Sequence, residues 1–234
     1  MKIVSINQPA YLPWLGYFQR IAASDVHIVL DHVQYEKNSM VNRNKIRTAN
    51  GWCWLTVPLK TGGKFGDLPI NQLVIADCKW RKKHWDSIVH NYRKSPYWSQ
   101  YAPLLEPVYS METDNFLEMV KILLQKLLTA LQINTPLLFS SELKPEKHKS
   151  DLVLELCRIA EADIYLSGPF GKDYLQMEDF ERNGIKVVFQ NYIHPEYKQI
   201  YPGFEPYMSA VDLLFNRGPD SFRIMNENQT LQLK

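Results

Sequence analysis

Hydrophobic positions near the N-terminus follow a strand–helix–strand order. Residues 2–6 form a short apolar run that predicts a buried strand, and residues 14–23 place apolar side chains at the spacings of an amphipathic helix. A second apolar run covers residues 26–30. This order predicts a βαβ unit, and therefore a parallel sheet. Because ligands of such sheets bind beyond the carboxyl ends of the strands, residues 7–11 and 31–35 are expected to border a ligand site.

The rest of the chain continues to alternate between strand and helix patterns. Strands are expected at residues 52–59, 72–76, 137–139, 163–166 and 185–190. Helices are expected at residues 80–94, 113–131, 150–160 and 209–215, and a short helical segment is expected from Phe180 onward. Ser150 is the expected N-cap of the helix at 150–160. Residues 95–110 are rich in Pro and Tyr and are expected to be a connection. We therefore predict one α/β domain over residues 1–234, with a mainly parallel, Rossmann- or nucleotidylyltransferase-like sheet and a helical insertion at about 80–135.

Composition narrows the class of protein. The 234 residues are 45% hydrophobic and 22% charged, which excludes a disordered chain, a fibrous repeat and a disulfide-knotted mini-protein. A net charge of +2 argues against a polyelectrolyte partner such as nucleic acid. The chain has three cysteines, Cys53, Cys78 and Cys157, which fit no metal-binding pattern and cannot all pair in disulfides, and this favours a reducing, cytoplasmic setting. The N-terminus does not resemble a signal peptide and no long apolar run is present, so no membrane insertion is expected.

The segment after the first expected strand is the most distinctive candidate for ligand binding. It contains Gln8, Tyr11, Trp14 and Gly16 among prolines and further aromatic residues. Proline stiffens such a loop, glycine permits close approach of a backbone, and a helix N-terminus offers unpaired N–H groups to an anion. The alternative is that the aromatic side chains only fasten the helix to the sheet.

Residues 42–47 carry two guanidinium groups, an ammonium group and two amides. Arg43 is suited to bidentate phosphate binding and Lys45 to a point-charge contact, with Asn42 beside them. A solvated basic loop is the other interpretation. We expect one pocket to be faced by Gln8, Tyr11, Asp31, Tyr35 and Arg43, because these residues end neighbouring strands or follow them.

Three residues are candidates for acid–base chemistry. His194 lies in a polar, aromatic loop beside Glu196, where an imidazole next to a carboxylate can act as an acid or a base; it could also be an ordinary loop histidine. His84 is a second candidate, on the helix expected at 80–94. Asp31 is a carboxylate at the end of the second expected strand.

Two further patterns bear on ligands and partners. Ser167 and Gly168 begin a turn after an expected strand, where a second anion could bind, although the spacing is not that of a P-loop. Residues 79–94 interleave basic and aromatic side chains, a pattern that fits an acidic carrier protein, nucleic acid or a solvated helix, and the low net charge disfavours nucleic acid. No spacing of His, Cys, Asp and Glu matches a metal site.

Five segments together resemble the WbqC-like family of bacterial proteins. They are residues 8–18 (QPAYLPWLGYF), 41–46 (VNRNKI), 54–58 (WLTVP), 165–168 (YLSG) and 209–216 (SAVDLLFN). The resemblance spans nearly the whole chain and implies a place in gene clusters for O-antigen and other surface polysaccharides. The first βαβ unit also looks like the start of a nucleotidylyltransferase, whose His-x-Gly-His signature would fall on residues 14–17. Trp14 and Tyr17 replace both histidines, so this likeness supports the fold more than adenylyl transfer.

These features favour one function and leave two others open. The first is a transferase of surface-polysaccharide (O-antigen) biosynthesis that moves an acyl or aminoacyl group onto a nucleotide-linked amino sugar. It requires no resident cofactor, with a carrier-protein phosphopantetheine thioester as a possible donor and an acidic carrier protein as a possible partner. The second is a nucleotidylyltransferase that uses Arg43, Lys45 and His194. The third is a non-catalytic protein of the assembly machinery that binds sugars or carriers through its aromatic loop.

Overall fold

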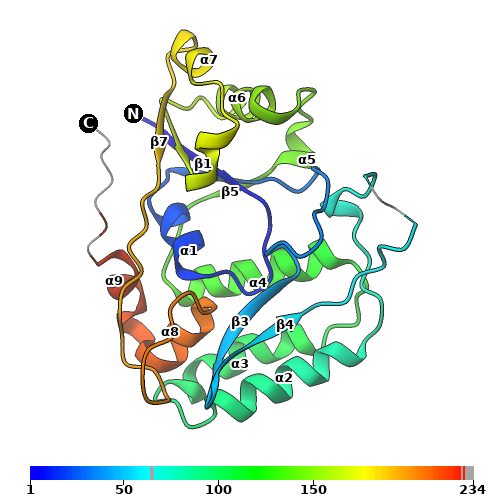
Figure 1. The fold of residues 1–234 in the computed structure, drawn as a ribbon, viewed down its shortest axis with the longest axis vertical. Helices are drawn as coiled ribbons and strands as arrows, with labels where there is room; N and C mark the ends of the chain where they lie inside the picture. Colours follow the sequence, from blue (N-terminus) through cyan, green and yellow to red (C-terminus); the bar gives the residue numbers. More distant parts are fainter. Residues whose placement is uncertain (64–65, 228, 230–234) are drawn as a thin grey trace.

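The computed structural model, which describes residues 1–63, 66–227 and 229, is built around a five-stranded parallel sheet (Figure 1). The order across the sheet is β5-β2-β1-β6-β7, and every neighbouring pair is parallel. The strands are β1 (Ile3–Asn7), β2 (Val26–Val29), β5 (Leu137–Phe139), β6 (Ile164–Ser167) and β7 (Lys186–Phe189). The predicted α/β class is therefore confirmed, and the first strand lies at the centre of the sheet.

The strand order reverses between β1 and β6. From β1 the chain adds β2 and then β5 on one side, before it crosses to β6 and β7 on the other side. Val4 is paired with Val26 on β2 and with Tyr165 on β6, so β1 is hydrogen-bonded along both edges. In open parallel sheets such a reversal leaves a crevice at the carboxyl ends of the two central strands, where ligands bind.

Helices cover both faces of the sheet, as a parallel sheet requires. α1 (Leu15–Ala22) lies on one face, where the ring of Tyr17 is 5.8 Å from that of His27 on β2. α6 (Lys149–Ile159) and α7 (Met177–Arg182) cover the other face, and their apolar side chains share a cluster with alternate residues of β1. Successive side chains of β1 point to opposite faces of the sheet, so the strand contributes to the packing on both faces.

The connection from β2 to β5 contains a β-hairpin and three helices (Figure 1). β3 (Arg43–Thr48) and β4 (Gly51–Thr56) form the antiparallel hairpin. α2 (Lys79–Tyr92), α3 (Trp98–Tyr109) and α4 (Phe116–Ala130) follow, where the helical insertion is expected. Buried side chains of all three helices join the larger hydrophobic core, which also receives α1.

Three expectations about local structure are wrong. Residues 95–110, expected to be a connection, form α3 despite two prolines inside the helix, because the apolar face of this helix is buried in the core. Residues 72–76 form isolated bridges rather than a strand. The N-cap position of α6 is His148, so Ser150 lies within the helix and does not cap it.

The remaining elements complete the described chain. They are α5 (Ser140–Leu143), α8 (Ala210–Arg217), α9 (Ser221–Asn226) and the short 3₁₀ helices η1 (Ile70–Gln72), η2 (Pro169–Asp173) and η3 (Gly218–Asp220). Among the helices that the structure describes, none is both long enough and apolar enough to cross a membrane.

A buried carboxylate on α8 joins segments that are distant in the sequence. The hydroxyl of Tyr92 donates to Asp212 Oδ1 at 2.9 Å, while the hydroxyl of Tyr197 and the amide of Gln199 donate to Oδ2 at 2.8 and 2.9 Å. Burial raises the pKa of Asp212 to about 6, although the three donors oppose this shift. The network connects α2, α8 and the loop that contains Tyr197.

Candidate functional site

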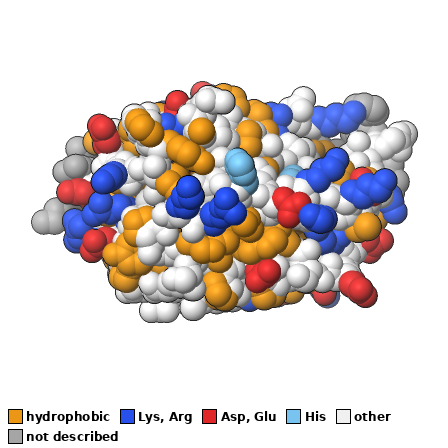
Figure 2. All heavy atoms as spheres, turned by 90° about the horizontal axis from the view of Figure 1, so that it is seen from below, with side chains coloured by type: hydrophobic (Ala, Val, Ile, Leu, Met, Phe, Trp, Pro, Cys, Tyr) orange, Lys and Arg blue, Asp and Glu red, His pale blue; other side chains and the backbone are white. Residues whose placement is uncertain are grey.

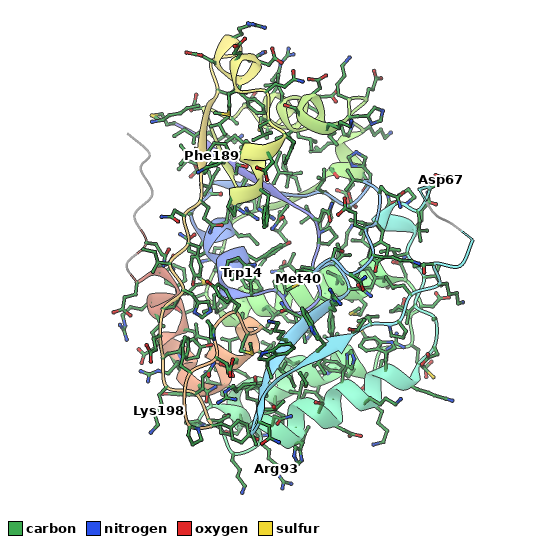
Figure 3. The ribbon with its side chains drawn as sticks, in the orientation of Figure 1. Trp14, Met40, Asp67, Arg93, Phe189 and Lys198 are labelled. Carbon is green, nitrogen blue, oxygen red and sulfur yellow. The ribbon has the colours of Figure 1, made fainter. Side chains whose placement is uncertain are left out.

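A pocket of about 290 Å³ opens at the carboxyl ends of β1 and β6, the two strands between which the strand order reverses. It is lined by Ile6, Asn7, Gln8, Pro9, Ala10, Pro13, Trp14, Tyr17, Arg20, Met40, Val41, Asn44, Tyr165, Ser167, Gly168, Pro169, Phe170, Gly171, Tyr174 and Gln190. Figure 3 labels Trp14 and Met40, which border the pocket from the N-cap position of α1 and from the segment before β3. This is the position at which ligands of open parallel sheets bind.

Arg20 on α1 is the only charged residue among the described residues that line this pocket. Its side chain is 7% exposed and forms no ion pair with a carboxylate among the described residues, and its Nε has no hydrogen-bond partner there. The guanidinium lies against Gly168, since a Cβ atom at that position would be 2.1 Å from Nη1. Burial lowers the pKa of Arg20.

A buried cation without a counter-ion is costly, with an effective penalty of several kcal/mol after relaxation. Proteins normally offset this cost by pairing the charge or by coordinating it. Arg20 has no internal anion among the described residues and borders a pocket that contains no carboxylate. The arrangement therefore favours an anionic ligand, and a guanidinium is suited to bind a phosphate or a carboxylate with two parallel hydrogen bonds.

Two neighbours of Arg20 also carry buried polar atoms that have no partner in the described part of the chain. They are the hydroxyl of Tyr17 and Nε2 of His27. His27 Nδ1 is 2.7 Å from the hydroxyl oxygen of Ser5, and burial, assisted by the charge of Arg20, lowers the pKa of His27 to about 3. The imidazole is therefore neutral at physiological pH. Buried polar groups normally have a hydrogen-bond partner, which can be a ligand or an ordered water. The Tyr17 hydroxyl and His27 Nε2 therefore favour a ligand or ordered water next to Arg20.

An aromatic wall closes one side of the pocket. Trp14 precedes α1, and its indole lies 5.4 Å from the ring of Tyr192 and 5.8 Å from that of Tyr207. Gly16 makes room for this indole, because a Cβ atom at residue 16 would be 2.3 Å from the Trp14 ring. Gly16 therefore contributes by positioning Trp14 and is not itself part of the lining.

His194 lies behind the aromatic wall and does not line the pocket. Its Nδ1 is 2.9 Å from the carbonyl oxygen of Pro195, and its Nε2 accepts from the backbone N–H of Tyr207 at 3.1 Å. Burial lowers the pKa of His194. Both ring nitrogens are engaged within the protein, so this placement disagrees with the expected acid–base role and indicates that His194 positions Tyr207.

His84 and Tyr11 lie together in the core, away from the pocket. The Tyr11 hydroxyl is 2.9 Å from His84 Nδ1 and 3.0 Å from the hydroxyl of Tyr109. Burial lowers the pKa of His84 to about 4, and burial raises that of Tyr11 well above its usual value. Because Tyr11 has no exposed surface, the structure does not support ligand binding by Tyr11 or general-base catalysis by His84 at this site.

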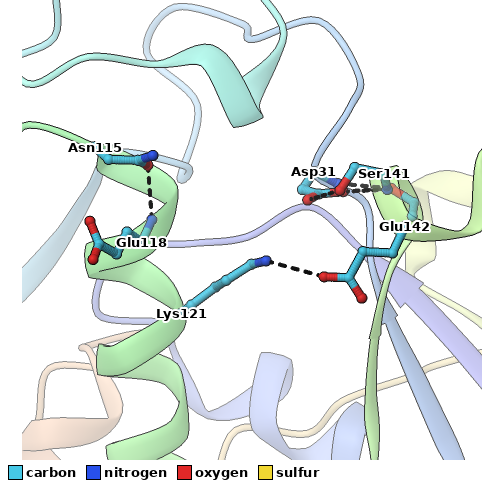
Figure 4. A network of polar contacts seen from close by, with 7 residues as sticks. Asp31, Asn115, Glu118, Lys121, Ser141 and Glu142 are labelled. Atoms are coloured by element: carbon cyan, nitrogen blue, oxygen red, sulfur yellow. Dashed lines mark hydrogen bonds and ion pairs between the residues drawn. The ribbon is translucent and has the colours of Figure 1, made fainter.

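Asp31 is fully buried at the end of β2 and holds the chain near α5 (Figure 4). The hydroxyl of Ser140 donates to Oδ1 at 2.9 Å, and Ser141 donates through its N–H to Oδ1 at 2.8 Å and through its hydroxyl to Oδ2 at 2.7 Å. Both carboxylate oxygens are therefore used internally. The position indicates a structural role for Asp31 and does not support the expected catalytic one.

The expectation that five residues face one pocket is wrong. Gln8 lines the pocket beside Arg20, whereas Tyr35, Asn42 and Arg43 line a separate hollow of about 230 Å³. Asn42 accepts from the Tyr35 hydroxyl at 3.0 Å and donates to the carbonyl of Val57 at 2.8 Å, so its amide is largely used within the protein. The difference arises because β6, and not β2, completes the ligand crevice beside β1.

Four of the expected binding residues do meet at the pocket. Gln8 and Trp14 approach from the β1 side, and Ser167 and Gly168 from the end of β6. Lys45 lies outside it, on the outer face of the β-hairpin with Arg43. The turn after β6 is thus placed where an anion bound by Arg20 would lie.

A larger and more open hollow of about 810 Å³ lies beside the start of α2. Its charged residues are of both signs: Lys60, Asp77, Arg81, Lys82, Glu112 and Asp114. Figure 2 views the molecule from below, the side on which α2 lies, and shows Lys and Arg side chains interspersed with acidic and hydrophobic ones. Because its charges are of both signs, this hollow does not favour one class of ligand. Docking of an acidic carrier protein at residues 79–94 stays a prediction. Within the described residues, no group of three or more His, Cys, Asp and Glu side chains could hold a metal ion.

The sequence reasoning missed Arg20 and Tyr17 as ligand-binding residues. One signal was available, because Lys2 and Arg20 are the only charged residues in the first 24. Arg20 lies in the last turn of α1, however, and a single charge there does not by itself indicate a ligand site. The missing information was the position of β6, which turns this helical arginine into part of a pocket.

Comparisons with known proteins agree over most of the chain. A family model described as the WbqC-like protein family matches residues 8–224. A protein of Mycobacterium tuberculosis (strain ATCC 25618 / H37Rv), described as uncharacterized protein Rv1507c, is 36% identical over 223 residues, which cover 94% of this chain and 96% of the relative. The matched range includes every element that lines the pocket from Gln8 onward.

Proposed function

The chain belongs to the WbqC-like protein family, and we propose that it is a transferase of surface-polysaccharide (O-antigen) biosynthesis that moves an acyl or aminoacyl group onto a nucleotide-linked amino sugar. The observation that carries the proposal is the buried Arg20, which has no counter-ion among the described residues, in a pocket at the carboxyl ends of β1 and β6. Nucleotide-linked sugars supply the phosphate that such a cation requires. A cytoplasmic location belongs to the same proposal and agrees with the free thiols of Cys53, Cys78 and Cys157.

The size and lining of the pocket suggest how such a substrate would bind. At about 290 Å³, the pocket is just below the roughly 300–1,000 Å³ range of small-molecule sites. We assign a phosphate to Arg20 and the turn at Gly168, and a sugar ring to the indole of Trp14, whose apolar face suits the C–H groups of a pyranose. The remainder of the nucleotide would extend past Met40 and Phe170, which are exposed beside the pocket.

The proposed chemistry depends on positioning more than on a catalytic side chain. Among the described residues, the pocket lining contains no carboxylate, imidazole, thiol or lysine. In acyl transfer from a thioester, the sugar amine attacks the carbonyl carbon, the C–N bond forms as the C–S bond breaks, and the proton lost by the amine ends on the released thiol. Holding the two reactants in contact can itself lower the barrier by several kcal/mol. A phosphopantetheine thioester on an acidic carrier protein is the proposed donor, and no resident cofactor is invoked.

The same lining also supports the alternative of a non-catalytic sugar-binding protein. Binding a sugar does not require a carboxylate, imidazole, thiol or lysine, and none of these groups is found among the described residues that line the pocket. A nucleotidylyltransferase receives less support. Arg43, Lys45 and His194, which were to replace the imidazoles of that enzyme class, all lie outside the pocket. Trp14 and Tyr17 do border it, but neither supplies a cationic donor.

A transfer assay distinguishes these functions. The protein would be incubated with a panel of nucleotide-linked amino sugars and acyl or aminoacyl thioesters, and the products analysed by mass spectrometry. We expect amide formation that is lost in Arg20→Met and retained in Arg158→Met, a matched change at an exposed position on α6. Pyrophosphate release from a nucleoside triphosphate would support the nucleotidylyltransferase instead. Saturable sugar binding without turnover of any pair would support the binding protein.

A further inference from the structure

The outer face of the β3–β4 hairpin carries two cations stacked on two exposed indoles. The guanidinium of Arg43 lies 4.5 Å from the ring centre of Trp54, and Lys45 Nζ lies 4.1 Å from that of Trp52 and 5.4 Å from that of Trp54. We call these four residues the cation–indole ladder. The ladder follows from strand geometry, since Lys45 is paired with Trp54 and the other contacts are diagonal cross-strand contacts.

The ladder is separate from the pocket that contains Arg20. Side chains alternate along a strand, so Arg43 and Lys45 point to the face of β3 opposite to Asn44, which lines that pocket. The ladder therefore belongs to neither the pocket nor the core, and the proposed transferase reaction leaves it without a role.

The charges of the ladder are held in place but not neutralised. Neither Arg43 nor Lys45 forms an ion pair with a carboxylate among the described residues, and Arg43 Nε is buried without a hydrogen-bond partner there. Within the part of the chain that the structure describes, the Arg43 guanidinium donates only to the carbonyl oxygen of Asn38, at 2.5 Å. Cation–π contacts fix the position of each charge without cancelling it, so the face presents two preorganised cations to an anion.

The apolar part of the ladder is exposed but small. Trp52 is 43% exposed and Trp54 is 37% exposed, whereas most of the large hydrophobic side chains of the protein are buried. A stable protein partner needs about 800 Å² on each side, far more than two half-exposed indoles provide. Single-stranded nucleic acid needs open ring faces on which successive bases stack. The two indoles are instead nearly perpendicular, at 81°, and cations already occupy ring faces.

We propose that the cation–indole ladder is a binding site for an acidic saccharide, that is, a sugar that carries carboxylate or phosphate groups. The anionic groups contact Arg43 and Lys45, and the C–H surface of the sugar packs on the exposed parts of Trp52 and Trp54. Two residues along a strand span about 7 Å, so the cations are spaced to contact anionic groups on the same short saccharide.

The test is an NMR titration that follows the indole N–H signals of the tryptophans. The probes are trigalacturonate for carboxylates, glucose 1-phosphate for phosphate, maltotriose as the neutral match and hexathymidylate as a single-stranded oligonucleotide. We expect at least one acidic sugar to shift the Trp52 and Trp54 signals, and maltotriose to leave them unchanged. Which acidic sugar binds more tightly identifies the anionic group.

Substitutions then assign the binding to the ladder. Because both cations are partly exposed, Lys45→Met should weaken binding about two- to fivefold, and Arg43→Met combined with Lys45→Met about tenfold. Lys83→Met on α2 is the matched control and should leave the affinity for the acidic sugar unchanged. Unchanged melting temperatures would show that the variants are folded. Arg20→Met should also leave this binding unchanged, so the outcome is independent of the proposed transferase. Equal affinity in the double variant, binding of maltotriose with the same affinity, or tighter binding of hexathymidylate would overturn the proposal.

Discussion

Replacing Arg20 with methionine should stabilise the unliganded protein while it removes the ability to bind anions. Methionine keeps much of the apolar stem within α1 and removes a charge that has no counter-ion among the described residues. Replacement of a buried ion pair by well-packed apolar residues is often neutral or stabilises a protein by about 1–4 kcal/mol, and an unpaired charge lacks the attraction that offsets the cost of burial in a pair. We expect a value of about 1–2 kcal/mol, because the arginine borders the pocket and is not wholly removed from solvent.

This gain should appear as a higher melting temperature. For a chain of this length, 1 kcal/mol corresponds to about 2–4 °C, so the expected increase is about 2–8 °C. Calorimetry or circular dichroism in a buffer without phosphate or sulfate measures it. Addition of phosphate should then raise the melting temperature of the wild-type protein and leave that of Arg20→Met unchanged.

The exposed Arg93, which follows α2, provides the matched control. Arg93→Met should change the free energy of unfolding by less than about 0.5 kcal/mol. A clear loss of stability in Arg20→Met, together with an unchanged phosphate effect, would show that Arg20 is a structural residue and that the reasoning about an unpaired charge is wrong.

Three further predictions follow from individual contacts. Gly168→Ala places a Cβ atom 2.1 Å from the Arg20 guanidinium and should weaken binding of a phosphate ligand about 10- to 150-fold in calorimetry, with the fold retained. Gly16→Ala would collide with the Trp14 ring and should destabilise the protein by about 1–3 kcal/mol in urea denaturation; an unchanged midpoint would contradict the assigned contact. The pKa of Asp212 is raised from 3.8 to about 6, so the folded state retains a proton that the unfolded state releases between about pH 4 and pH 6. The free energy of unfolding should therefore fall by about 3 kcal/mol as the pH rises through this range. Asp212→Asn should lose this contribution, so the difference between the wild-type protein and the variant should show the slope.

Local patterns were sufficient to predict the centre of the fold. The apolar run of β1, the amphipathic α1 and the apolar run of β2 are close in the sequence and form one unit, so their pattern determined the parallel pairing. The same reasoning failed for α3, because the prolines at 103 and 107 normally mark a break, and only burial of the opposite face in the core explains the helix.

The candidate site depended on contacts that the pattern does not encode. β6 follows β1 by more than 150 residues along the chain, and its position beside β1 created the pocket. The anion-binding expectation placed on Arg43 came from a cluster of basic residues, whereas Arg20 is a single charge in an uncharged helix. An isolated buried charge becomes conspicuous only when its surroundings are known.

The central claim is that the pocket at the carboxyl ends of β1 and β6 binds the phosphate of a nucleotide-linked sugar through Arg20. The most direct measurement is calorimetric titration of the wild-type protein and of Arg20→Met with a panel of nucleotide-linked amino sugars and with the corresponding nucleosides, which lack phosphate. We predict that at least one nucleotide-linked sugar binds the wild-type protein, that its nucleoside binds far more weakly, and that Arg20→Met lowers the affinity for the sugar nucleotide about 10- to 150-fold. Equal affinity of both proteins for the sugar nucleotide, or equal affinity of the wild-type protein for sugar nucleotide and nucleoside, would contradict the claim.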